Sequence, residues 1–275
     1  MFNLLTWARD LLGTRELLNQ LEERDAKISD LESKIYDLTR YGNPTYDADH
    51  MRLWNKNVSF MRDPLFRKAY NIGINSDHGL GIPGAIDIHI EYRIAVCCWA
   101  AWHCRQLAGD FVECGTNTGI MSLAICDYID FNATKKNFYL FDTYEGIPLE
   151  QITEAESHAL QQNAAYRDCF DIAKKNFSPY PRANLVKGKV PDTLSVPDID
   201  KVCYLMIDMN IAAPERAALE FFWDKIVPGG IVLFDDYGWA GYEAQKEAHD
   251  KFAMTKGLQI FNLPTSQGML IKPPK

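Results

Sequence analysis

The chain has 275 residues, of which 47% are hydrophobic and 24% are charged, and its formal net charge at pH 7 is −8. This composition excludes wholesale disorder and is typical of a globular protein that buries one large core. The negative charge argues against a nucleic-acid backbone as the main partner.

Residues 1–41 are predicted to form an N-terminal amphipathic or coiled-coil helix. Its apolar side chains follow the three- and four-residue spacing of a heptad repeat, with a positions at Leu21, Ile28 and Ile35 and d positions at Leu17, Leu31 and Leu38. β-Branched residues at a with leucine at d favour a parallel dimer, in which Lys27 at g would face Glu32 at the following e position of the other chain. A single amphipathic helix that packs on its own domain is the alternative.

Residues 42–92 are predicted to be a linker followed by a helical cap or lid, and residues 93–275 to form an α/β domain. The stretch "YGNPTYDAD" (41–49) has the composition of a linker, and residues 74–89 form a loop punctuated by glycine and proline. Small and apolar residues fill 91–109, which predicts a closely buried helix.

Strand and helix patterns alternate from residue 110 onwards. Strands are predicted at 110–115, 137–142, 183–188, 202–208, 230–236, 258–264 and 268–274, and helices at 119–130, 150–176, 213–226 and 241–256. This alternation predicts a doubly wound α/β fold with a mostly parallel seven-stranded sheet and helices on both faces. The last two strands are joined by a turn too short for a helical crossover, so they are predicted to form an antiparallel hairpin.

Ligands of such sheets bind beyond the carboxyl ends of the strands, where the strand order reverses. The first strand ends in "ECGTNTG", in which Gly115 and Gly119 allow a tight turn before a helix N-terminus that suits an anionic group. The second ends in Asp142, about 20 residues later, where an acid can accept hydrogen bonds from two ribose hydroxyls. Together these features indicate a nucleoside-containing cofactor. A dinucleotide and S-adenosylmethionine both stay open, although the loop lacks the GxGxxG spacing of NAD sites.

Five segments are informative as motifs: "DFVECGTNTG", "FYLFDTYEGIP", "LMIDMN", "APERAALEFFWDKIVPGGIVLFDDYG" and "LPTSQGMLIKP". They resemble the macrocin O-methyltransferase family, the TylF-like class I methyltransferases, over about residues 85–273. Members of that family use S-adenosylmethionine and a divalent metal to methylate sugar hydroxyls. The resemblance implies an O-methyltransferase whose acceptor is a glycan, glycolipid, nucleotide sugar or glycosylated natural product.

The resemblance also implies roles for individual residues. The methionine part of the cofactor would contact Glu113, Gly115, Thr116, Thr118 and Gly119, the ribose Asp142 with Thr143 and Tyr144 beside it, and the adenine Gly188. The family's metal ligands match Asp208, Asp235 and Asp236, and Asp208 would also contact the cofactor.

Electrostatics supports a metal at these three aspartates. Carboxylates at adjacent strand ends repel each other unless a cation is present, and a hard dication such as Mg²⁺ takes a few carboxylate oxygens and keeps positions for substrate. Asp208 is the candidate general base for the departing hydroxyl proton. Taken singly, a strand-end aspartate is more often a turn or helix cap than a metal ligand.

Two residues depart from the family pattern. Many members have a second acid and a tyrosine where this chain has Asn210 and Ile211, and related small-molecule methyltransferases often have a lysine at the position of Ile211. These departures leave the identity of the sugar open and argue against lysine-assisted catalysis.

Side chains near the last strands are candidates for binding the acceptor. Tyr237, Trp239 and Tyr242 follow the aspartate pair and either form an aromatic wall for a sugar or pack internally. Gln267 lies in the "TSQG" turn at the same edge of the predicted sheet, which makes it a candidate substrate contact.

The sequence predicts a cytoplasmic protein that forms homo-oligomers. Its seven cysteines lack metal-ligand spacing and lie mostly in apolar stretches, as buried thiols of a reducing compartment do. A secretory signal is not evident, and no apolar run approaches the roughly 20 residues of a transmembrane segment. Two other functions stay open: an NAD-dependent sugar-modifying enzyme on the same fold, and a non-catalytic coiled-coil adaptor with a relic methyltransferase domain.

Overall fold

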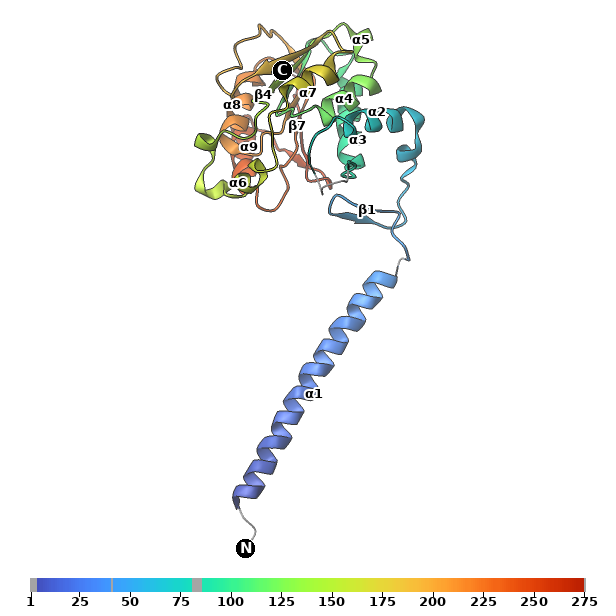
Figure 1. The fold of residues 1–275 in the computed structure, drawn as a ribbon, viewed down its shortest axis with the longest axis vertical. Coiled ribbons are helices and arrows are strands. Elements are labelled where there is room, and N and C mark those ends of the chain that lie inside the picture. The colour runs from blue at the N-terminus through green and yellow to red at the C-terminus, as the bar shows by residue number, and fades with distance from the viewer. Residues whose placement is uncertain (1–3, 41, 81–85, 275) are drawn as a thin grey trace. The chain divides into compact units, whose positions relative to one another are not determined.

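A computed structural model describes residues 4–40, 42–80 and 86–274 of the chain (Figure 1). The side chains of residues 4–12 and of Leu38 lie outside this description, so the predicted d position at Leu38 does too. In the part that is described, no helix combines the length and the apolar character that crossing a membrane requires.

The chain divides into two compact units, Met1–Val58 and Ser59–Lys275. The division falls inside the segment 42–92 that the sequence predicts to be a linker and a cap. That segment contains ordered secondary structure on both sides of the division, namely a hairpin before it and helices after it.

The N-terminal unit contains one long helix and a short hairpin. Helix α1 runs over Leu4–Thr39, within the predicted N-terminal helix. Strand β1 (Tyr46–Ala48) pairs antiparallel with β2 (Met51–Leu53) in a region that has the composition of a linker. Asp49 and His50 join these strands with φ angles of 50° and 54°, the left-handed conformation of both central residues in a type I′ turn.

The second unit contains a seven-stranded sheet in the order β5-β4-β3-β6-β7-β9-β8. Its strands are β3 (Asp110–Cys114), β4 (Phe138–Asp142), β5 (Ala183–Lys187), β6 (Val202–Ile207), β7 (Ile226–Phe234), β8 (Phe261–Asn262) and β9 (Gly268–Ile271). The first five strands in the sheet order are parallel, whereas β9 is antiparallel to β7 and to β8. The predicted fold class and its terminal hairpin are confirmed.

Helices cover both faces of the sheet (Figure 1). They are η1 (Ser59–Arg62), α2 (Pro64–Ile74), α3 (Glu91–Cys104), α4 (Ile120–Tyr128), α5 (Phe131–Thr134), α8 (Ala212–Trp223) and α9 (Glu243–Thr255). Phe111 of β3 packs in a core with α2, α3 and α4, whereas its neighbour Val112 packs in a second core with α8 and α9. Because both faces are covered, all six residues of β6 are buried, which explains the continuous apolar run there.

The predicted polar helix over 150–176 consists of four short helices. They are η2 (Leu149–Gln151), η3 (Glu154–Glu156), α6 (His158–Asn163) and α7 (Phe170–Phe177). Thr153 and Glu156 form a reciprocal capping box, which starts a new helix at this point. The Glu156 carboxylate also accepts a hydrogen bond from the Ala212 N–H at 2.6 Å, which ties this segment to the start of α8.

Strand β7 begins at Ile226, earlier than the predicted start at residue 230. Helix α8 ends at Trp223, and Ile226 already pairs with Val202 of β6. The register then shifts before Ile231. The Pro-Gly-Gly sequence between the two pairings is therefore an irregularity inside the strand and does not precede it.

The strand order reverses between β3 and β6. The chain enters the sheet at β3, adds β4 and β5 on one side, and then crosses to β6 and β7 on the other. The carboxyl ends of these strands thus face the position where α/β sheets bind their ligands.

Candidate functional site

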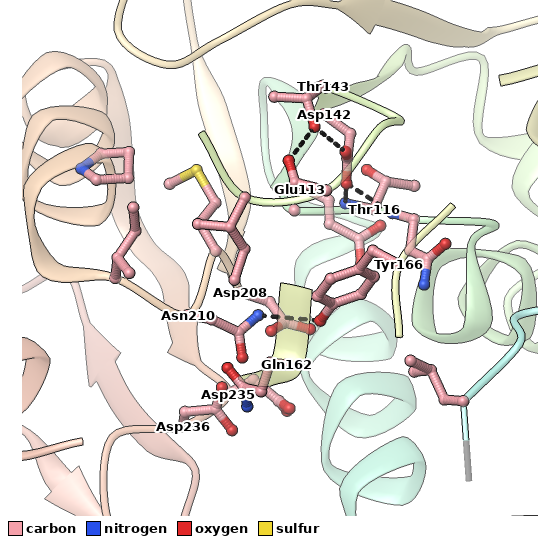
Figure 2. Close-up of a pocket in the computed structure, with 18 of the residues that line it drawn as sticks. Glu113, Thr116, Asp142, Thr143, Gln162, Tyr166, Asp208, Asn210, Asp235 and Asp236 are labelled. Atoms are coloured by element: carbon pink, nitrogen blue, oxygen red, sulfur yellow. Dashed lines mark hydrogen bonds between the residues drawn. The ribbon is translucent and has the colours of Figure 1, made fainter. Parts of the chain in front are cut away.

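A cavity of about 440 Å³ lies at the carboxyl ends of the central strands (Figure 2). Most of the side chains predicted for the site line it: Glu113, Gly115, Thr116, Asp142, Thr143, Gly188, Asp208, Asp235 and Asp236. These residues lie together because they directly follow parallel strands, whose carboxyl ends meet at one edge of the sheet.

Gly115 approaches the backbone of the neighbouring strand end. Its φ is +95°, and a Cβ built on it would lie 1.7 Å from the carbonyl oxygen of Asp208. Backbone hydrogen bonds fix this contact, since the Asp208 N–H donates to the Cys114 carbonyl at 2.8 Å and the Gly115 N–H to the Phe141 carbonyl at 2.8 Å. A glycine is required here for contact between two strand ends.

Gly115→Ala is expected to destabilise the protein by about 2 kcal/mol or more beyond the cost of Gly241→Ala. Gly241 has the same φ of +95° but nothing within 4 Å of an added Cβ. The pair therefore separates the backbone clash from the cost of a positive φ. Urea unfolding of both variants measures the difference, and equal losses would contradict the contact.

Thr118 and Gly119 do not line the cavity, although the resemblance places them against the cofactor. The Thr118 hydroxyl is fully buried 2.9 Å from the Ser76 hydroxyl. A Cβ on Gly119, whose φ is +100°, would lie 2.5 Å from the Phe177 ring. Both residues shape the turn into α4 from behind.

Asp142 holds this turn by accepting backbone hydrogen bonds. Its Oδ2 accepts from the N–H groups of Thr116 and Asn117, each at 2.7 Å, and its Oδ1 from the Tyr144 N–H at 2.5 Å and the Thr143 hydroxyl at 3.3 Å. Burial raises the pKa of Asp142, and the backbone donors oppose that rise. Its contact with a ribose stays a prediction.

The buried polar atoms at the cavity that have no hydrogen-bond partner among the described residues include Glu113 Oε2, Thr116 Oγ1 and Asn117 Nδ2. Burial raises the pKa of Glu113 to about 8, helped by the nearby Asp142 and Asp235 carboxylates and opposed by the Ser122 hydroxyl. Buried polar groups are rarely left without partners. These atoms therefore mark a place for a polar ligand, and the Glu113 acceptor suits a cationic one.

Asp208, Asp235 and Asp236 converge on the other side of the cavity (Figure 2). One oxygen of each lies within 4.8 Å of the others. Burial and the charges of Asp235 and Asp236 raise the pKa of Asp208 well above its ordinary value. Carboxylates so arranged disfavour their own ionisation and favour a bound cation.

Arg93 of α3 contacts this cluster. Its Nη1 lies 2.7 Å from Asp235 Oδ2 and 3.9 Å from Asp236 Oδ1, and its guanidinium lies 5.1 Å from the centre of the Trp239 ring. The contact joins residues 142 positions apart, which no local pattern reveals.

Gln267 supports the cluster from behind and is not a lining residue. It is fully buried, and its Nε2 donates to Asp235 Oδ1 at 2.9 Å. Arg93 holds the other oxygen of the same carboxylate. The expectation that Gln267 contacts the substrate is therefore corrected, because its amide orients Asp235.

A buried acid fixes the loop that follows Asp208. Glu215 Oε1 accepts from the N–H groups of Met209 and Asn210 at 2.9 and 3.0 Å, while its Oε2 lies 2.8 Å from His249 Nε2. Asn210 has a φ of 63°. The network holds a strained loop against α8 and α9, and the sequence reasoning missed it.

Aromatic side chains enclose the remaining wall. Trp239 and Tyr242 line the cavity, whereas Tyr237 is buried away from it and bonds Asp250 at 2.5 Å. Tyr166 also lines it and was not predicted; its hydroxyl lies 3.4 Å from Asn210 Nδ2 (Figure 2). Burial, then the Asp208 and Asp236 charges, raises the pKa of Tyr166.

Comparison with known proteins gives a consistent result. The family model "Macrocin-O-methyltransferase (TylF)" matches residues 96–261. A curated relative, the 8-demethyl-8-(2,3-dimethoxy-alpha-L-rhamnosyl)-tetracenomycin-C 4'-O-methyltransferase of Streptomyces olivaceus, is 25% identical over 141 residues, which are 47% of this chain. The matched part spans 53% of that relative, about half its length.

Two solved structures share the fold. The O-methyltransferase NovP has a TM-score of 0.63 at 18% identity, over 79% of this chain and 100% of its own. The calicheamicin methyltransferase CalS11 has a TM-score of 0.51 at 14% identity, over 79% of this chain and 94% of its own. At these identities the likeness concerns the fold.

Proposed function

Because the chain belongs to the TylF family of macrocin O-methyltransferases, we propose that it transfers the methyl group of S-adenosylmethionine to a sugar hydroxyl. The acceptor is a carbohydrate-containing small molecule or a glycan. One observation carries the proposal: unpartnered polar atoms suited to a cofactor and a carboxylate cluster suited to a cation line the same cavity.

The residues beside β3 fit the amino-acid part of the methyl donor. Glu113 offers a buried oxygen without a described partner, which suits an ammonium group. Thr116 and Asn117 offer a hydroxyl and an amide at the same turn. Asp142 and Gly188 lie at the next strand ends and line the cavity where ribose and adenine would bind.

The residues beside β6 and β7 fit a divalent cation such as Mg²⁺. Asp208, Asp235 and Asp236 supply the oxygen ligands that this ion prefers. A bound cation would act as a Lewis acid that lowers the pKa of the acceptor hydroxyl. Arg93 and Gln267 orient Asp235 within the set.

Asp208 is the proposed general base. It lines the cavity on the strand end next to Glu113, where its carboxylate would lie within reach of the acceptor hydroxyl. Bound S-adenosylmethionine would supply the methyl group from its sulfonium to the acceptor oxygen, and Asp208 would take the hydroxyl proton. Positioning of the two reactants supplies most of the acceleration.

The acceptor is proposed to lie against Trp239, Tyr242 and Tyr166. Their rings offer apolar faces with polar tips, which suit a sugar. Asn210 and Ile211 also line this part of the cavity. They are the positions where the chain departs from its family, so they are the candidates for selecting the acceptor.

The proposed enzyme works in the cytoplasm as a homo-oligomer. All seven cysteines are buried free thiols, as in proteins of a reducing compartment. The exposed apolar face of α1 offers a surface for self-association.

Calorimetric titration and a methyl-transfer assay test the function. S-Adenosylhomocysteine is expected to bind more tightly than NADH, and labelled methyl groups to pass to members of a panel of free, nucleotide-linked and polymeric sugars. Mg²⁺ should support turnover and EDTA should abolish it. Tighter binding of NADH would indicate the dinucleotide enzyme, and cofactor binding without turnover on the whole panel would favour the adaptor.

A further inference from the structure

Helix α1 carries an apolar face with exposed side chains. The core heptad residues whose side chains are described are 48% to 61% exposed: Leu17, Leu21, Ile28, Leu31 and Ile35. These residues define the α1 seam. A helix in a protein gains most of its stability when such an apolar face packs against another surface. We therefore expect a partner along the seam of this 36-residue helix.

We propose that a second copy of this chain covers the α1 seam, in a parallel, in-register, two-stranded coiled coil. Ile28 and Ile35 occupy a positions, and Leu17 and Leu31 occupy d positions. β-Branched residues at a with leucine at d pack best in two-stranded parallel coiled coils. A helix of this length spans about 54 Å, enough for several successive layers of such contacts.

The charges that flank the seam complement each other in the parallel arrangement. The g positions are Gln20, Lys27 and Lys34, and the e positions are Leu18, Asp25, Glu32 and Thr39. In a parallel coiled coil each g position faces the following e position of the other chain, so Lys27 faces the partner's Glu32, twice per dimer. In an antiparallel coiled coil g faces g and e faces e, which would bring lysines together and acids together. The charge pattern therefore selects both the partner and the direction.

Arg24 is the one polar residue at a d position between Leu17 and Leu31. In the in-register alignment it lies opposite its own counterpart, and Asp25, at the adjacent e position, supplies a compensating negative charge. A polar core residue of this kind lowers the stability of the coiled coil.

Sedimentation equilibrium of the full chain tests the association. The protein is expected to have twice the chain mass of 31.4 kDa at micromolar concentration. Ile28→Asn should raise the dissociation constant about 100-fold or more, because each dimer loses two apolar core side chains. Ser29→Asn, one residue along at an outward b position, is the matched control and should leave the dissociation constant unchanged.

A charge-swap series tests the partner. Lys27→Glu should weaken the dimer about 10-fold, because it places like charges at both g–e contacts. Adding Glu32→Lys should restore wild-type affinity, which a contact within one helix would not do. Arg15→Glu makes the same change of charge at a b position and should have no effect.

Cysteine cross-linking tests the direction. All seven native cysteines are buried. A disulfide that forms between chains on oxidation therefore comes from a thiol introduced on α1. Leu21→Cys, at an a position, and Leu31→Cys, at a d position, should each form disulfide-linked dimers with themselves. In a mixture of the two variants, an antiparallel coiled coil that packs Leu21 against Leu31 would instead give mainly the mixed dimer.

Three results would overturn the proposal. A monomer at these concentrations would show that the seam does not self-associate. A dimer indifferent to Ile28→Asn would assign association to another surface. A predominant mixed disulfide between positions 21 and 31 would show an antiparallel pair.

Discussion

Asp208→Asn is expected to lower the rate of methyl transfer by about 10³-fold or more, because general-base catalysis alone contributes about 10²–10⁴-fold. The substitution also removes a ligand from the proposed cation site. The ligand-free protein should become more stable. Burial and the Asp235 and Asp236 charges raise the pKa of Asp208, so the ionised form is disfavoured there, and an amide of the same shape relieves the repulsion.

Initial rates with labelled S-adenosylmethionine, Mn²⁺ binding by electron paramagnetic resonance, and thermal unfolding measure the three effects. Asp224→Asn is the matched control, because Asp224 is an exposed acid at the end of α8. It should leave rate, metal affinity and unfolding temperature unchanged. A rate for Asp208→Asn within tenfold of wild type would remove Asp208 from the catalytic role. A lower unfolding temperature would show that the carboxylate stabilises the ligand-free site.

The location of the site was predictable because its residues directly follow strands. In a parallel sheet the carboxyl ends meet at one edge, so Glu113, Asp142, Asp208 and the pair at 235 and 236 could be placed together from the chain order alone. The structure brings the three aspartates to within 4.8 Å. Apolar runs buried on both faces made the strands themselves easy to recognise.

The residues that orient the site were not predictable in this way. Gln267 was expected at this edge of the sheet, but its hydrogen bond to Asp235 was not. The bonds of Arg93 to Asp235 and of Glu215 to the Met209 N–H were also not expected, because they join elements that pack only in the folded chain. Such contacts follow from how helices pack, which a single sequence does not encode locally. Tyr166 was missed for the same reason, since it lies in a polar segment whose short helices break the periodic signal.

The glycine turn shows a second limit of prediction from sequence: a position can be recognised while its structural reason is not. The sequence predicts a tight turn at Gly115 and Gly119 that presents a helix N-terminus to a ligand. In the structure a side chain at Gly115 would collide with the Asp208 carbonyl, and one at Gly119 with the Phe177 ring. A glycine in the sequence indicates a close approach to the backbone, but only the fold shows which group of the protein makes that approach.

Glu113→Gln is expected to weaken the binding of S-adenosylhomocysteine about 100-fold at pH 7.5. Glu113 Oε2 is buried without a described partner, and an ammonium group of the ligand would supply one. Removing one member of a buried charge pair costs about 3–5 kcal/mol, from which the cost of ionising Glu113 is subtracted. Calorimetric titration measures the affinity, and Glu220→Gln, at an exposed position of α8, is the control.

The pH dependence of this binding identifies the group. Burial raises the pKa of Glu113 to about 8, so the free protein is protonated there at neutral pH, while the ion pair with the ligand requires the ionised form. Binding should therefore release one proton, and affinity should rise about tenfold per pH unit below pH 8. Titrations in buffers of different ionisation enthalpy should count about one proton for the wild type and none for Glu113→Gln.

Glu113→Gln should weaken ligand binding but stabilise the ligand-free protein. The pKa of Glu113 is raised from 4.5 to about 8, so the folded state holds a proton that the unfolded chain has lost. This contribution to stability is complete below about pH 4.5 and is lost as the pH rises to about 8. Glutamine stays neutral throughout, so the variant should unfold at a higher temperature than wild type at pH 8, and the difference should shrink towards pH 5. A variant that lost both affinity and stability at pH 8 would make Glu113 a structural acid. One that gained stability and lost affinity would show that the fold carries a destabilising buried carboxyl group because the ligand needs it.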